Sequence, residues 1–423
     1  MRTFLVSLLI GAVATASPVW GFSESELVPG GTLLTLEESL ARVLKDDAQV
    51  KRAEARLEKE EALLKAVKRE AFPKLKTELY TAAVSHDNRG IIFWTSEIRL
   101  PLFEGGRRIH EKRKKDLEVQ EQKLHIEETR QEVAYQVKAI YIGLLKEKEL
   151  TRLSQEWVKE SQKFYITMKS LYEKELMTRE DLFRWEALYK AAQQELLKHK
   201  EAMDYGESLI MELAAVGERE HIELEPLGEV SAKELDFNTS LEEMRKQNPL
   251  YEITKLRVKQ KEEEKKVLRS ERFPKLGLST RFNLAKDSFV DQNRFELGIV
   301  GSWNIWDFGV LGNEIKAKEA EIKEVTEDGH IQTRTLEHEA RKLMGDLRVA
   351  WGKIEATKGL LQDKKEAYQN DKTRLLAGEK GEAEIFDAFV TLTQVQMTVI
   401  EAITDYRLLS IQLEKIIGEE VSA

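Results

Sequence analysis

Hydrophobic positions follow two different periods in this chain, and both return in the second half. From about residue 107 to 172, apolar residues recur every three or four positions, as on one face of a helix. Residues 310–376 show the same period. Both segments lack proline and are rich in Glu, Lys, Gln, Leu and Ala, which favour helices. We therefore expect two helices of about 65 residues, each about 100 Å long.

Between the helical segments the period changes to two. Residues 75–83 and 92–102 alternate apolar and polar side chains, and 276–284 and 295–305 do the same. Each run is about ten residues, the length that a tilted membrane strand needs. An apolar face and a polar face suit lipid outside and water inside. A half-buried sheet in a soluble protein shows the same alternation, so the pattern leaves both interpretations open.

The order of these elements is repeated. Phe72–Leu75 returns 201 positions later as Phe273–Leu276, and Leu102–Gly106 returns 203 positions later as Ile305–Gly309. Repetition at nearly one offset predicts two structural copies. Shorter helices are expected over 35–70, 180–216, 239–271 and 382–417. The predicted organisation is a signal peptide (1–21), a first repeat (22–216), a linker (217–237), a second repeat (238–418) and a tail (419–423).

The first residues have the features of a secretory signal. A basic Arg2 precedes the apolar run Phe4–Ala14. Ala14 and Ala16 offer a small-residue cleavage site, and Val19 and Gly21 offer a second one. After this segment, no apolar stretch of about 18 residues is present, so we expect any membrane crossing to be made by strands.

Composition narrows the functional classes. The chain has no cysteine, which excludes disulfides and thiolate metal sites. A net charge of -9 disfavours nucleic acid as a partner. His338-Glu339 lacks the second histidine of a metalloprotease motif. We predict no enzyme activity, no cofactor and no metal.

With these elements in place, the chain resembles the TolC-type outer-membrane efflux protein family. The run Pro101–Arg107 resembles that family's passage from strand to helix, and Thr35–Leu40 resembles its first helix. The stretch from Leu376 to Glu379, followed by Glu384–Ala388, resembles its C-terminal half. The resemblance extends from about residue 32 to 418.

The resemblance implies a mainly α fold with membrane β-strands: a long-helix α-barrel plus four strands per chain. Four strands cannot close a barrel, and an open edge in lipid is forbidden. The family forms homotrimers with a 12-stranded outer-membrane β-barrel among the lipids and a helical tube in the periplasm. It works with a periplasmic adaptor protein and an inner-membrane transporter in efflux or type I secretion. The alternative is a periplasmic adaptor or coiled-coil scaffold, which would lack the four strands.

The resemblance also indicates a channel aperture. Glu384 and Asp387 match the family's ring of acidic side chains, and three copies would bring six carboxylates around one axis. Gly378 and Gly381 would form the turn at the tip. The alternative is an ordinary solvated first turn of a helix, where acidic residues are favoured anyway.

Two further groups follow from the resemblance. Lys380 and Glu180 match a basic and an acidic position of a clamp that holds the tip closed, and Leu375 stands where the family has a tyrosine. Lys380 could equally be a solvated lysine. The bend from strand to helix is expected at Pro101, Gly105 and Gly106 in the first copy and at Gly309 in the second.

Overall fold

The computed structural model describes residues 32–84, 89–213, 222–224, 230–232, 236–287, 290–377 and 381–418. The predicted signal peptide, most of the predicted linker, Gly378, Lys380 and the C-terminal tail lie outside them. The chain divides into two compact units. The strand unit comprises Arg42–Val137, Leu235–Val349 and Leu409–Ala423, and the helical unit comprises Met1–Ala41, Lys138–Glu234 and Ala350–Leu408.

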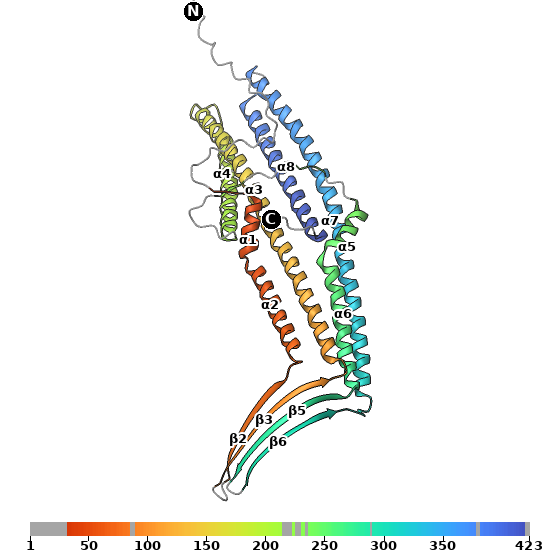
Figure 1. Cartoon of the computed structure of the whole chain (residues 1–423). Helices are drawn as coiled ribbons and strands as arrows, with labels where there is room; N and C mark the ends of the chain where they lie inside the picture. The colour runs from red at the N-terminus through yellow and green to blue at the C-terminus, as the bar shows by residue number, and fades with distance from the viewer. Residues whose placement is uncertain are drawn as a thin grey trace, which may run out of the picture. The chain divides into compact units, whose positions relative to one another are not determined.

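The four predicted strands form one antiparallel sheet in the strand unit, in the order β2-β3-β5-β6 (Figure 1). Their bounds are β2 Lys74–Val84, β3 Arg89–Phe103, β5 Lys275–Asp287 and β6 Val290–Ser302. The expectation that the fourth strand reaches Ile305 was wrong for the single chain. Ser302 pairs with Lys275, the first residue of β5. Pro274 precedes it and has no N–H to continue the ladder.

Both long helices were predicted correctly. They are α3, Arg107–Glu173, and α7, Val310–Leu376, each of 67 residues. The other helices are α1 Leu36–Asp46, α2 Ala48–Arg69, α4 Arg179–Leu213, α5 Phe237–Gln247, α6 Pro249–Arg269 and α8 Glu382–Ile417, with a 3-10 turn at Ser270–Arg272. In the strand unit, α2, α3, α6 and α7 continue from the sheet in the order of the strands to which they connect (Figure 1).

Two segments expected as single helices are each divided in two. Asp47 separates α1 from α2, and its carboxylate accepts hydrogen bonds from the backbone N–H groups of Gln49 and Val50. Asn248 separates α5 from α6 and caps the N–H of Leu250. Pro249, the first residue of α6, cannot donate to the preceding turn. The two breaks are 201 positions apart and add a landmark to the repeat.

A small parallel pair was not predicted: β1, Thr32–Leu34, lies beside β4, Ile222–Leu224, in the helical unit. No helix among the described residues is both long and apolar enough to cross a membrane.

Candidate functional site

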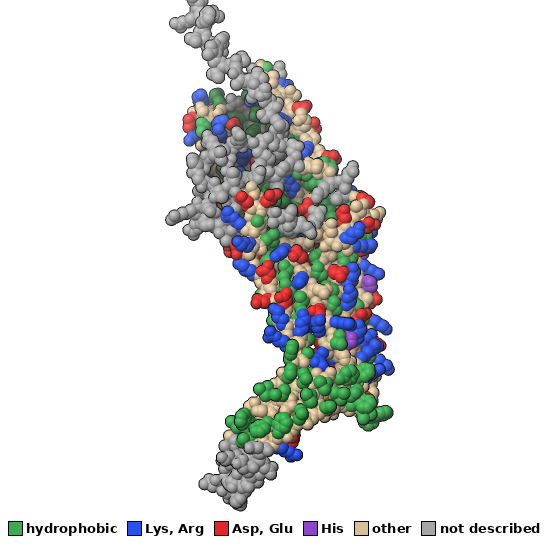
Figure 2. All heavy atoms as spheres, in the orientation of Figure 1, with side chains coloured by type: hydrophobic (Ala, Val, Ile, Leu, Met, Phe, Trp, Pro, Cys, Tyr) green, Lys and Arg blue, Asp and Glu red, His purple; other side chains and the backbone are tan. Residues whose placement is uncertain are grey.

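The sheet has one apolar face, and that face is exposed. Leu75, Leu79, Leu297 and Ile299 are each between 64% and 72% exposed. Figure 2 shows hydrophobic side chains gathered over the sheet, whereas charged side chains cover the adjoining helices. An exposed apolar face of this extent marks a surface that another apolar phase covers.

The opposite face of the sheet carries a polar cluster. Glu97 on β3 accepts hydrogen bonds from the Ser279 hydroxyl at 2.9 Å and from Arg99 at 2.9 Å, and lies 3.5 Å from Arg281. The register places Lys76, Glu97, Arg281 and Glu296 in one cross-strand row of alternating charge. Opposite charges directly across strands stabilise a sheet. This row of charged side chains makes the face polar.

Two bends join the strands to the long helices, and both use left-handed backbone. Gly105 and Gly106 have φ values of 62° and 87°, and Phe308 and Gly309 have 52° and 85°. Asp307 caps the second bend by accepting from the N–H groups of Gly309 and Leu311, both at 2.9 Å. Pro101 is not in the bend as expected but inside β3, where the register with β5 shifts between Pro101 and Phe103.

In the helical unit, an aromatic cluster joins α3, α4 and α8. Phe164, Trp185 and Phe386 lie with ring centroids 4.6 to 5.5 Å apart. Met168 is buried in the same cluster, and Phe389 packs against it. The cluster fixes the starts of α4 and α8 against the end of α3, because each of the three helices contributes at least one ring.

The predicted acidic pair lies beside this cluster. Glu384 and Asp387 are on α8 on either side of buried Phe386, and both carboxylates are exposed. Phe386 therefore orients the first turn of α8, and the two acids are left toward solvent.

The clamp residues are only partly described. Glu180 is exposed in the first turn of α4, and Leu375 is half-buried near the end of α7. Gly381 directly precedes α8 and is exposed. Lys380 and Gly378 fall outside the described residues, so the Lys380–Glu180 pair stays a prediction. In the turn between α3 and α4, Glu175 adopts a φ of 61°.

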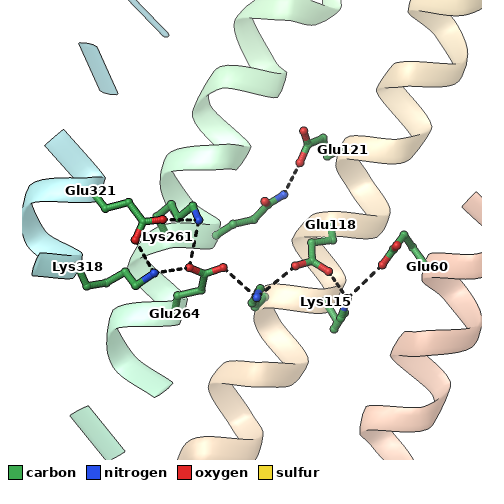
Figure 3. Close-up of polar contacts among 10 residues, drawn as sticks. Glu60, Lys115, Glu118, Glu121, Lys261, Glu264, Lys318 and Glu321 are labelled. Atoms are coloured by element: carbon green, nitrogen blue, oxygen red, sulfur yellow. Dashed lines mark hydrogen bonds and ion pairs between the residues drawn. The ribbon is translucent and has the colours of Figure 1, made fainter. Parts of the chain in front are cut away.

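A ladder of ion pairs crosses the helices of the strand unit, and sequence analysis did not find it (Figure 3). Glu60 on α2 pairs with Lys115 on α3, Lys114 on α3 pairs with Glu264 on α6, and Lys318 on α7 also pairs with Glu264. Burial would raise the pKa of Glu264, but Lys114 and Lys318 lower it to about 2. The signal in the sequence was charge at helical spacing, which does not reveal partners on other helices.

Glu121 is a buried acid on α3, 9% exposed. It accepts from Arg257 at 2.8 Å and from Gln260 at 2.7 Å, both on α6, and lies 3.4 Å from His125. Burial would raise its pKa, but these hydrogen bonds lower the pKa to about 2. Hydrogen bonds to Glu121 and Glu128 raise the pKa of His125 to about 9. His125 is therefore a cation at neutral pH.

Within the described ranges, no group of three or more His, Asp or Glu side chains could hold a metal ion.

Comparison with known proteins identifies the family that has this architecture. A family model described as outer membrane efflux protein matches residues 40–211 and 241–419, which correspond to the two repeats. No curated protein sequence matches the chain significantly.

Solved structures share the fold. The outer membrane protein VceC from Vibrio cholerae is 13% identical with a TM-score of 0.73, covering 90% of this chain and 96% of that one. The Campylobacter jejuni CmeC outer membrane channel is 13% identical with a TM-score of 0.76, covering 92% and 87%. The open-state MtrE outer membrane channel from Neisseria gonorrhoeae is 12% identical with a TM-score of 0.74, covering 92% and 89%. The chain belongs to the outer membrane efflux protein family, whose members are exit channels in the outer membrane with a helical tube in the periplasm.

Proposed function

We propose that this protein is the passive exit duct of a tripartite efflux or type I secretion system. Substrate would arrive from an inner-membrane transporter through a periplasmic adaptor protein, and the transporter would supply the energy. The observation that carries the proposal is a sheet with an exposed apolar face joined directly to helices of 67 residues. At ~1.5 Å per residue such a helix is about 100 Å long, enough to cross most of a periplasm.

The unpaired edges of the sheet support a trimer. Among the described strands, β2 and β6 each pair on one side only. Backbone groups left unpaired in lipid cost several kcal/mol each, so membrane sheets close on themselves. Four strands are too few for closure, whereas three copies would supply a 12-stranded barrel.

The two faces of the sheet would then have separate roles. The exposed leucine and isoleucine side chains would contact lipid, and the row containing Glu97 and Arg281 would face the water-filled lumen. At the start of α8, Glu384 and Asp387 from three copies would surround the axis and favour cations over anions.

A planar-bilayer recording tests the proposal. Protein purified in detergent without residues 1–21 is expected to form discrete channels as a trimer. Ile299→Asp places a carboxylate on the lipid-facing side and is expected to reduce channel insertion strongly. Asn283→Asp adds the same group to the polar face and serves as the matched control, which should insert normally. A protein that stays in solution without detergent and gives no channels would contradict the proposal.

A further inference from the structure

The strand pairing within each hairpin shows which residues of the two repeats are equivalent. Lys74 pairs with Arg99 in the first hairpin, and Lys275 pairs with Ser302 in the second. β5 is therefore β2 displaced by 201 positions, and β6 is β3 displaced by 203. The bends obey the same rule, since Gly106 and Gly309 have φ values of 87° and 85°.

The boundary between the two repeats, here called the internal seam, is visible within the chain. It consists of β3 against β5 and of α3 against α6. Arg99 of β3 pairs with Lys74, the first residue of β2. β3 continues past this pair, and its Leu100 and Pro101 pair with Leu278 and Gly277 of β5. On the helices, Glu121 binds Arg257 and Gln260 across the same seam.

The outer edge of the second repeat, at β6, has the same alternating pattern as β3 but no neighbouring strand on its outer side among the described residues. Its alternating pattern continues past Ser302 through Trp303 and Ile305, which are 57% and 74% exposed. In the first repeat the equivalent positions, Leu100 and Leu102, belong to β3, whose extension pairs only with the strand of the next repeat. An extension of β6 therefore calls for a strand equivalent to β5, and β2 of a second copy is that strand.

We propose that the seam between neighbouring copies repeats the internal seam, with β6 of one copy extended to Trp306 and paired with β2 of the next. The inference rests on the proposed trimeric duct and specifies its register. Transferring the internal pairs by 203 and 201 positions sets Ser302 opposite Glu78, Trp303 opposite Thr77 and, past the register shift, Trp306 opposite Leu75 of the next copy.

Charged residues on the helices support the same seam independently of the strands. The equivalents of Glu121, Arg257 and Gln260 are Glu324, Arg56 and Lys59. An acid again stands opposite an arginine, Lys59 takes the place of Gln260, and all three side chains are exposed in the single chain. The proposed seam therefore holds an ion cluster of Glu324 with Arg56 and Lys59 of the next copy, in the place of the enclosed Glu121 cluster.

The transferred register also provides the stagger that a closed barrel requires. Within the chain, the cross-strand row from Lys76 passes Glu97 and reaches Arg281, four positions beyond Gly277, the equivalent of Lys76. If the row were continued without stagger, Arg294 would lie opposite Glu78 of the next copy, which is also an attractive pair. A sheet with no stagger between its strands cannot close into a barrel, however. The copy is not identical at the bend, because Phe308 occupies the place of Gly105 and needs a wider seam there.

Disulfide trapping measures the register directly, because the natural chain contains no cysteine. Glu78→Cys is combined in turn with Ser302→Cys, Gly298→Cys and Arg294→Cys, all on the same face of β6. Paired β residues bring Cα atoms within the 4.4–6.8 Å that a disulfide spans. Mild oxidation should give covalent multimers on non-reducing gels, most strongly with Ser302→Cys. A maximum at Arg294 or Gly298, or no product at all three, would overturn the register.

Charge exchange tests the helical half of the seam. Glu324→Arg should abolish or strongly reduce the SDS-resistant trimer, and adding Arg56→Glu with Lys59→Glu in the same chain should restore it. A trimer that is unaffected by the first change, or not restored by the second, would refute the ion cluster. Channels that persist while the cross-links fall at another register would remove the inference alone, whereas loss of trimer and channels in the unmodified protein would remove the proposed function as well.

Discussion

At the residue scale, the glycines of the two bends carry different constraints. A Cβ on Gly105 would lie 2.5 Å from the Ser270 carbonyl oxygen and 2.8 Å from the Phe273 Cβ. In the second bend Phe308 occupies the place of Gly105, and Gly309, the equivalent of Gly106, is also left-handed but has open space around it. The same bend is therefore enclosed in the first repeat and free in the second, because only the first bend packs on a following repeat of its own chain.

This difference gives a paired prediction. Gly309→Ala should cost only the strain of a left-handed alanine, about 1 kcal/mol. Gly105→Ala should cost that strain plus about 1–3 kcal/mol for displaced backbone. Thermal unfolding of the two variants in detergent measures the difference, and equal losses of stability would contradict the enclosed bend.

His125 gives the protein a pH dependence. Its pKa is raised from 6.5 to about 9 by Glu121 and Glu128, so the folded state binds its proton more tightly than the unfolded state. The resulting stability is complete below pH 6.5 and is lost as the pH rises through 9. The melting temperature should fall across this window and should fall less in His125→Gln. The hypothesis fails if both proteins show the same slope.

At the element scale, short polar side chains and aromatic rings decide where helices end and which helices they contact, which the helical period does not specify. Asp47 and Asn248 end one helix and start another within segments that read as continuous. The aromatic cluster then brings together α3, α4 and α8 through Phe164, Trp185 and Phe386. Neither feature changes the composition of a segment, but each changes where a helix begins and what it contacts.

Phe386 tests the role of this cluster. Phe386→Ala removes a side chain that is 5% exposed and should cost about 3–5 kcal/mol, which loosens the first turns of α8. Hydrogen exchange should increase in α8 near Ala383 and in α4 near Trp185. Phe183→Ala, at a 52% exposed ring on α4, is the control and should leave exchange nearly unchanged. Equal effects would show that the cluster does not hold these helices.

At the scale of the whole molecule, the duplicated order divides one chain into two similar parts. Both long helices, both hairpins and both bends recur in the same sequence order. The edges at β2 and β6, and the exposed acids on α8, have their proposed roles only when several copies surround one axis.

Ion selectivity tests the proposed aperture. Glu384→Gln with Asp387→Asn removes two carboxylates per chain and should lower the cation-to-anion permeability ratio, measured as a reversal potential across a salt gradient. Glu401→Gln removes an exposed acid elsewhere on α8 and should leave the ratio unchanged. An unaltered ratio in the double variant would exclude these residues from the selective part of the channel.

The sequence by itself determined the elements and their duplication. The period of three to four predicted α3, α7 and α8, and the period of two predicted the four strands, because side-chain burial along one element follows its own geometry. It also located Glu384 and Asp387 near the start of α8. It could not locate Glu121 with Arg257, Glu264 with Lys318, or the ring cluster around Phe386, because these pairs join residues far apart in the chain. Only the tertiary structure decided such partners, and it also decided that β6 stops at Ser302, where its neighbouring strand in the same chain begins.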